Sequence, residues 1–246
     1  MKRAHLWGLA GVVVAMTVLA ARMAFAQEGG DPAAEGASDK TLMDLINAGG
    51  FVGYVIIFCS IASLAIAIEC FVNIKKEKLC PPHIVAELET LLEEGQYDEA
   101  VALCEGTRVY ITNVVGASVA RAAEGPEAMT AGMEEALDQE NLKLMHKISI
   151  LSLLGNIGPM LGLTGTVTGM IGSFQMIEKL ATPSPAQLAK GIYEALVTTC
   201  EGLFLAIPVL TVFFILRNRV QRLALELSGV AGEIVDRFKP MAEGQK

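Results

Sequence analysis

The sequence is short of charge: Asp, Glu, Lys and Arg make up only 19% of its 246 residues, whereas hydrophobic residues make up 52%. Its mean hydropathy of +0.47 is too high for an ordinary soluble domain. The few charges are also unbalanced, with 19 basic residues against 27 acidic ones and a net charge of -8. No basic face is therefore available to release counterions from phosphates, which excludes a general nucleic-acid binder.

Clusters of catalytic or metal-ligating side chains are also missing. There are three histidines, and His83, three residues after Cys80, lacks a second pair of ligands. The sequence has no Ser/His/Asp or Cys/His constellation and no glycine-rich phosphate loop, so it predicts neither an enzyme nor a metal or cofactor site. The cysteines are expected to be free thiols, because they lie in apolar runs or in a segment predicted to be cytoplasmic: Cys59, Cys70, Cys80, Cys104 and Cys200.

The N-terminus has the order of features found in secretory signal peptides. Lys2 and Arg3 precede an apolar run over 6–21, and Ala24-Phe25-Ala26 supplies a small-x-small cleavage site. Residues 1–26 are therefore predicted to be a signal peptide, and an uncleaved signal anchor is the alternative. Both place residue 27 outside the cytoplasm. Residues 27–48 are small, polar and acidic, which predicts a flexible periplasmic tail.

Three further apolar stretches meet or exceed the roughly 20 residues that a bilayer core requires. Lysines follow the first stretch and arginines follow the third, whereas the segment between the second and third is poor in basic residues, so the positive-inside rule predicts an outside N-terminus and an inside C-terminus. The fold class predicted is an all-α membrane protein with long helices extending into the cytoplasm. Its predicted parts are transmembrane helices 49–72, 148–173 and 189–216, a cytoplasmic helical insert 73–147, a periplasmic loop 174–188, and a cytoplasmic C-terminal helix and tail 217–246.

The insert is helical by pattern. An amphipathic stripe from Ile84 to Leu92 ends at Gly95, and further helices are expected over 97–104 and 112–123. From Pro126 the helical pattern continues without a break into the second span, which predicts one long helix. For the third span, Ser184 is the expected N-cap with Pro185 at the first helical position.

The third span contains two carboxylates, Glu194 and Glu201. A charge inside a spanning helix costs roughly 2.5–3.5 kcal/mol on insertion scales, so such residues normally face a bundle interior or a water-filled path. They are seven positions apart and so share one helical face. Their depth is open: Glu194 lies near the outer interface if Arg217 marks the inner boundary, and a shift of a turn or two puts both inside. For Glu201, a place in the lumen and a neutral, helix-bonded carboxyl both remain open.

The second span contains a stripe of glycines at alternating spacings of three and four. Such a stripe lets another helix approach closely, and helix packing is its ordinary role. The neighbouring Thr166 either bonds back to its own helix or donates to water or a carboxylate. The helix-packing positions predicted are Gly155, Gly158, Gly162, Gly165, Gly169 and Gly172.

Two motifs, NIGPMLGLTGTV over 156–167 and GIYEALVTTCEGLFLAIP over 191–208, resemble the signature of the ExbB/TolQ/MotA proton-channel family. Three spans and a signal-like extension resemble the ExbB branch more than TolQ or the four-span MotA. The resemblance implies a proton pathway at Glu194, Thr166 and Thr199, to which Glu201 adds a second acid that many members lack. It also implies that Pro159 and Pro208 kink their helices. Phe213-Phe214 departs from the Tyr-Asn that the family often has there.

The same resemblance implies a homo-pentamer in the lipid of the bacterial inner membrane. The implied partners are an ExbD/TolR-like single-span protein and a TonB-like protein. The implied transported ion is the proton, whose movement drives the complex. A TolQ-like envelope role, another proton-driven motor and a non-conducting scaffold remain as alternatives.

Overall fold

The computed structural model describes residues 49–179 and 184–244. Within these ranges the chain is all-α, and its described residues contain no β-strand. The predicted signal peptide and periplasmic tail lie outside the described residues. The chain divides into two compact units, which are Met1–Ile66 with Leu151–Val212 (the apolar unit) and Ala67–Ile150 with Phe213–Lys246 (the polar unit).

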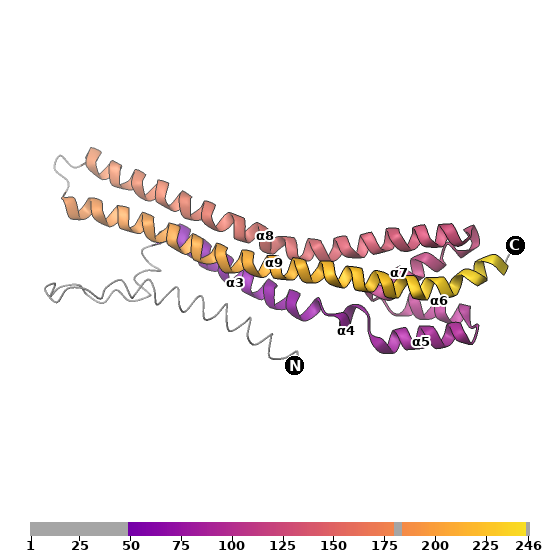
Figure 1. Cartoon of the computed structure of the whole chain (residues 1–246). Coiled ribbons are helices and arrows are strands. Elements are labelled where there is room, and N and C mark those ends of the chain that lie inside the picture. The colour runs from indigo at the N-terminus through magenta and orange to yellow at the C-terminus, as the bar shows by residue number, and fades with distance from the viewer. Residues whose placement is uncertain (1–48, 180–183, 245–246) are drawn as a thin grey trace. The chain divides into compact units, whose positions relative to one another are not determined.

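Three helices dominate the chain: α3 (Gly50–Asn73), α8 (Pro126–Lys179) and α9 (Pro185–Gly244) (Figure 1). Each is long and apolar enough to cross a membrane. The prediction of one continuous helix from Pro126 through the second span is confirmed by the 54 residues of α8. Pro159 lies inside α8 and Pro208 inside α9, and the kinks expected there stay predictions.

The connection between α8 and α9 is shorter than the predicted loop over 174–188, because α8 continues to Lys179 and α9 begins at Pro185. The predicted cap explains the early start of α9. The amide of Gln187 donates to the Ser184 hydroxyl at 3.4 Å, and the Ser184 amide donates to the Gln187 side-chain oxygen at 3.2 Å. This reciprocal cap satisfies two amides that a helix start leaves unpaired. The limits of the membrane itself stay predictions.

In the polar unit, short helices follow α3 and pack beside the long ones: α4 (Lys76–Leu79), α5 (Pro82–Glu93), α6 (Tyr97–Gly106) and α7 (Tyr110–Val119) (Figure 1). A 3-10 turn, η1 (Ala122–Glu124), leads to Gly125, whose φ of 108° turns the chain into α8. The expected helix over 112–123 was therefore misplaced. It begins earlier because the Thr112 hydroxyl accepts the Val109 amide at 3.1 Å, and it ends before η1.

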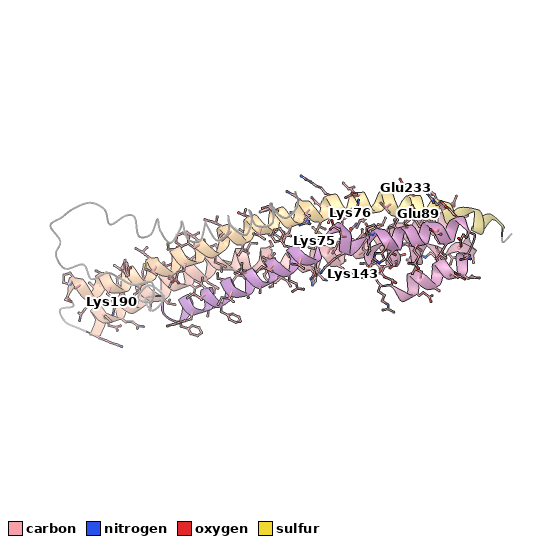
Figure 2. All side chains as sticks on the ribbon, turned by 90° about the horizontal axis from the view of Figure 1, so that it is seen from below. Lys75, Lys76, Glu89, Lys143, Lys190 and Glu233 are labelled. Carbon is pink, nitrogen blue, oxygen red and sulfur yellow. The ribbon has the colours of Figure 1, made fainter. Side chains whose placement is uncertain are left out.

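The core of the polar unit is apolar. Its fully buried side chains come from the short helices, from α8 and α9 and from the link between α3 and α4, and they include Ile74, Leu88, Ile111, Met129, Ile148, Leu227 and Phe238. Ion pairs join its elements at the surface. Lys76 contacts Glu226, and Arg237 lies 3.9 Å from Glu89 and 3.4 Å from Glu93. Figure 2 labels Lys76 and Glu89 in this unit. Exposed pairs of this kind contribute little stability each.

Candidate functional site

The glycines of α8 in the apolar unit form a seam against α9 of the same chain. A Cβ built on Gly162 would lie 2.9 Å from the Thr199 Cα, and one on Gly202 would lie 2.6 Å from the Gly158 carbonyl oxygen. Both distances are shorter than real Cβ atoms allow, so the two backbones approach as closely as they do only because these side chains are absent. For five of the six predicted glycines, a Cβ would lie no more than 3.0 Å from a backbone or side-chain atom of α9: Gly155, Gly158, Gly162, Gly165 and Gly169.

Gly172 differs from the other five, because no described heavy atom lies within 4 Å of its ideal Cβ position. Its packing role stays a prediction. The α9 side of the seam includes a glycine that the sequence analysis did not single out, Gly202. The one sign of its importance in the sequence is its position next to Glu201. The glycine stripe of α8 predicts that some helix packs closely against it, and it does not predict that this helix is α9.

Threonines of α9 line the seam. The Thr199 hydroxyl donates to the Gly162 carbonyl of α8 at 3.1 Å, which is a hydrogen bond between the two helices. Thr198 is buried, lies against Gly165 and donates to Ala195 within its own helix at 2.7 Å. Hydrogen bonds between helices are worth roughly 0.6 kcal/mol on average in membranes, so this bond adds to close packing without replacing it.

Thr166 is not joined to Thr199 by a hydrogen bond. Its hydroxyl donates to the Leu163 carbonyl at 2.7 Å, one of the two roles left open by the sequence. The neighbouring Thr164 and Thr168 likewise bond within α8. Thr166 is the residue after the seam glycine Gly165, but its hydroxyl group bonds within α8 and does not reach α9. A threonine can exchange such an intrahelical bond for one to water, because its side chain rotates about a single torsion.

Glu201 lies beside the start of α3. A Cβ on Gly49 would lie 2.8 Å from Oε2 and 3.3 Å from Oε1 of the Glu201 carboxyl group. The Oε2 atom is buried and has no hydrogen-bond partner among the described residues. A buried, unpaired carboxyl oxygen is costly, so Glu201 lies in an environment that differs from that of an ordinary packing residue. Gly49 was not predicted from the sequence, where its only signal is that it begins a Gly-Gly pair before the first span.

Glu194 has a different environment. It is half-exposed, with 40% of its side chain accessible, and its Oε1 lies 3.8 Å from the ammonium of Lys190 one turn earlier. Near it, Gly169 faces Ala195 and Gly191 faces Ser173, so α8 and α9 remain in close contact along this part of the seam. Seven residues of α-helix separate Glu194 from Glu201 by about 10.5 Å, which is too far for a direct proton transfer.

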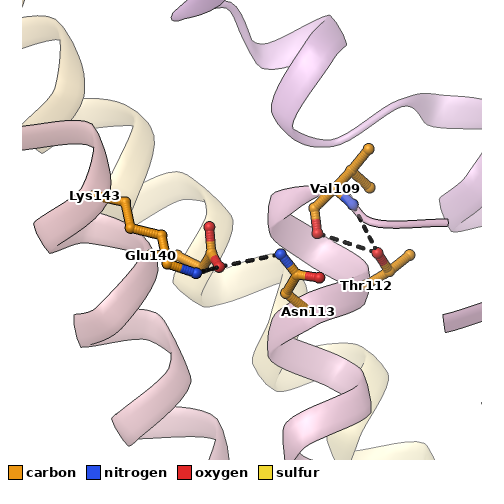
Figure 3. Close-up of polar contacts among 5 residues, drawn as sticks. All are labelled: Val109, Thr112, Asn113, Glu140 and Lys143. Atoms are coloured by element: carbon orange, nitrogen blue, oxygen red, sulfur yellow. Dashed lines mark hydrogen bonds and ion pairs between the residues drawn. The ribbon is translucent and has the colours of Figure 1, made fainter. Parts of the chain in front are cut away.

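A separate polar network joins α7 to α8 in the polar unit. Asn113 donates to Glu140 at 3.0 Å, and Lys143 donates to the same carboxylate at 2.7 Å (Figure 3). The Tyr110 hydroxyl donates to Asn141 at 2.8 Å. Burial, followed by the charges of Glu140 and Asp138, raises the pKa of Tyr110 to about 12.

The cysteines differ in exposure: Cys70, Cys80 and Cys104 are buried, whereas Cys200 is exposed. All five are free thiols, as predicted. Burial, followed by the charge of Glu105, raises the pKa of Cys104 to about 11, so its reactive thiolate is rare at neutral pH. The described residues contain no group of three or more His, Cys, Asp or Glu side chains that could hold a metal ion.

A family model described as the MotA/TolQ/ExbB proton channel family matches residues 107–228. This range contains the whole glycine seam and both carboxylates. The chain belongs to the MotA/TolQ/ExbB proton channel family. Helix α3 lies outside the range matched by the family model, and so does Gly49, beside which the Glu201 carboxyl lies.

Individual members of the family are more distantly similar. A putative biopolymer transport protein ExbB homolog of Methanothermobacter thermautotrophicus is 25% identical over 73% of this chain and 64% of that protein. The Tol-Pal system protein TolQ of Pseudomonas aeruginosa is 36% identical over 35% of this chain and 38% of that protein. The chain therefore spans less than two thirds of the length of either protein.

A solved structure of C. jejuni MotAB matches the fold. The match has a TM-score of 0.53 and 18% sequence identity, and it covers 95% of this chain and 89% of that chain. At this identity the likeness bears on the fold alone. It agrees with the all-α membrane architecture of three long apolar helices.

Proposed function

We propose that the chain is a proton-channel subunit of an inner-membrane complex that uses the proton-motive force to drive a TonB-like protein, in the manner of ExbB. The observation that carries the proposal is the pair of carboxylates on one face of α9, a helix held against α8 by the seam. A carboxylate at membrane depth is costly, and residues of this kind typically mark an ion or proton pathway. Membership of a proton channel family supports the same reading.

Glu194 is proposed as the obligatory proton carrier. Its half-exposed carboxylate is accessible to water or to a partner helix, and it lies 3.8 Å from the ammonium of Lys190. Thr199 and Thr166 are proposed as hydroxyls beside the path, and Glu201 as an auxiliary acid.

The assembly follows from the same proposal. A homo-pentamer surrounds the transmembrane helices of an ExbD/TolR-like single-span partner, with the N-terminus in the periplasm and the C-terminus in the cytoplasm. Exposed apolar side chains along the three helices support burial against lipid and neighbouring helices, among them Phe51, Phe58, Leu163, Phe174 and Leu196. Relatives named ExbB and TolQ both match, so a TolQ-like envelope role is the second candidate.

The deciding experiment compares Glu194→Gln with the wild type, each co-expressed with an ExbD/TolR-like single-span protein and reconstituted in liposomes. Glu194→Gln keeps the shape and hydrogen bonding of the side chain and removes titration. Proton flux, followed with an enclosed pH-sensitive dye, should be abolished while the complex still assembles. Lys190→Gln is the matched control and should retain flux. Wild-type flux in Glu194→Gln would exclude Glu194 as the proton carrier, whereas no flux from the wild-type complex itself would support a non-conducting scaffold.

A further inference from the structure

Charge is divided unevenly within the polar unit. The segments next to the points at which the chain passes into the apolar unit, which are 67–79, 140–150 and 213–226, contain eight Lys and Arg residues and four Glu residues. The rest of the unit contains five Lys and Arg residues against fifteen Asp and Glu residues. A surface of evenly solvated charges would not separate the two signs in this way. The separation singles out the three segments, to which no role has been assigned.

Two contacts bring these segments together around the end of α3. Lys76 of α4 contacts Glu226 of α9. The thiol group of Cys70 on α3 lies 4.0 Å from the carbonyl oxygen of Lys147 on α8. Helices α8 and α9 therefore both meet the chain within a few residues of Asn73, where α3 ends.

Four cations of these segments have no ion pair with a described residue, and they are Lys75, Lys147, Arg219 and Arg222. All four side chains are exposed or half-buried. Arg219 and Arg222 lie on the face of α9 that carries Glu226, since these positions are spaced by three and four residues. That face meets α4, which begins directly after Lys75. We refer to these four cations as the basic cluster.

The carboxylates of the same segments are already engaged. Glu226 contacts Lys76. Lys143 donates to Glu140 at 2.7 Å, and Glu69 accepts the side-chain amide of the residue one turn further along α3. The fourth acid, on α4, also has an interaction partner. Figure 2 shows Lys76 and Lys143 at one level of the unit. The positive charge of the basic cluster is therefore left for a ligand outside the described residues.

Exposed apolar side chains adjoin the basic cluster on two helices. Ile68 and Val72, which are 57% and 41% exposed, share a face of α3 that ends just before Lys75. On α8, Ile150 is 43% exposed and lies three residues from Lys147 on the same face. An apolar surface that continues into a cluster of cations matches an amphiphile, in which acyl chains are joined to an anionic group.

We propose that the basic cluster binds the headgroup of an anionic phospholipid, whose acyl chains lie along the exposed apolar residues of α3 and α8. Lys and Arg next to spanning helices attract anionic lipids, and basic pockets between such helices hold their headgroups. Arginine suits this role, because its planar guanidinium binds two phosphate oxygens at once. A soluble phosphate would gain nothing from the apolar surface, so a lipid is the ligand that fits both parts of the site.

The positive-inside rule does not by itself give this site. The rule counts basic residues along the chain and does not require that they converge or remain unpaired beside carboxylates. Arg217 contributes to that count as Arg219 does. A rotation of about 200° over two helical residues, at roughly 100° each, places Arg217 on the other side of α9. The inference therefore assigns lipid binding to one face of α9, and it does not depend on proton conduction.

The lipid preference of the full-length protein, purified in a neutral detergent, tests the site. Native mass spectrometry counts the lipids that stay bound after addition of phosphatidylglycerol or of phosphatidylcholine with the same acyl chains. The wild type should retain severalfold more phosphatidylglycerol. Its thermal unfolding midpoint should rise with phosphatidylglycerol and stay unchanged with inorganic phosphate, which lacks acyl chains. An equal rise with inorganic phosphate would overturn the inference in favour of a soluble anion.

Substitutions show whether the preference comes from the basic cluster. Lys147→Gln and Arg219→Gln should each lower the ratio of bound phosphatidylglycerol to phosphatidylcholine severalfold. Arg217→Gln is the matched control, since it removes the same charge from the other side of α9, and it should keep the wild-type ratio. Because the two lipids are compared within each variant, a change in stability does not imitate the loss of the site.

Three results would overturn the inference. A wild type without lipid preference would indicate that a protein segment covers the basic cluster instead. Wild-type ratios in both Lys147→Gln and Arg219→Gln would place the bound lipid elsewhere. An equal fall in Arg217→Gln and Arg219→Gln would reduce the preference to a general effect of net charge.

Discussion

The absence of a side chain at Gly49 is what lets the carboxyl group of Glu201 lie at the start of α3. A Cβ at position 49 would lie 2.8 Å from Glu201 Oε2, closer than a real contact allows. The atom that it would displace is the end of a flexible side chain, so the chain tolerates the change by moving the carboxyl group. Gly49 thereby sets the position of an acid that lies on another helix.

Gly49→Ala is expected to lower proton-driven work by roughly tenfold or less, the equivalent of about 1.4 kcal/mol in barrier height. The fold should be retained, because the Glu201 carboxyl can move aside. Activity per assembled complex is the measurement. Gly172→Ala is the matched control, since its new Cβ meets no described atom within 4 Å. Equal losses in both variants would show that the position of the Glu201 carboxyl does not matter.

The elements of this fold follow closely from the sequence. Continuous helical periodicity from Pro126 predicted α8, and the Ser184-Pro185 pair predicted the start of α9, because capping and proline act locally. The glycine spacing likewise predicted a close helix contact. It did not predict that α9 of the same chain makes the contact, since a stripe of small residues indicates only that the backbone of some other helix packs closely against it.

The candidate site was less predictable for the same reason. Glu194 and Glu201 stand out as charges in an apolar run, and their shared face follows from helix geometry. The neighbour of Glu201 is 152 positions away in the sequence, at Gly49, and no periodicity links the two. Thr166 was singled out by its position in a motif, yet its hydroxyl group bonds within its own helix. The motif does not predict this bond, because the partner of a hydroxyl group depends on which acceptors lie near it in the folded chain.

Gly162→Ala should destabilise the apolar unit by about 1–3 kcal/mol, the usual cost of overpacking. Its Cβ would meet the backbone of Thr199 at 2.9 Å and that of Thr198 at 3.0 Å, and backbone atoms cannot turn aside. The Thr199–Gly162 hydrogen bond should be lost as the helices separate. Denaturation in detergent measures the effect, again with Gly172→Ala as the control. An unchanged midpoint for Gly162→Ala would mean that the helices do not pack this closely.

Alkaline pH should destabilise the polar unit. The pKa of Tyr110 is raised from about 10 to about 12 and that of Cys104 from about 9 to about 11, in each case chiefly by burial. Between these values the unfolded chain binds fewer protons than the folded one, so stability falls as the pH rises from about 9 to about 12. Below pH 9 these two groups leave stability unchanged.

Tyr110→Phe tests this dependence. It should cost about 0.5–1.5 kcal/mol near neutral pH, because the hydrogen bond to Asn141 is lost. It should also reduce the loss of stability between pH 10 and 12. Unfolding midpoints measured across this range give both quantities, and Cys104→Ser should flatten the curve between pH 9 and 11. If Tyr110→Phe keeps the wild-type slope, the phenol is not the group that titrates.

Glu201 is expected to assist proton movement without being essential. It lies two turns of α9 from Glu194, about 10.5 Å away, so any exchange between them requires an intervening water. In a relay, Glu201→Gln should slow proton-driven work severalfold, and Glu201→Ala should slow it further by also removing the polar atoms that hold the water. In a packing role, both variants should lower the unfolding midpoint and leave activity per assembled complex at the wild-type level. The unpaired Oε2 favours the relay, because a carboxyl kept only for packing gains nothing from an unsatisfied oxygen beside Gly49.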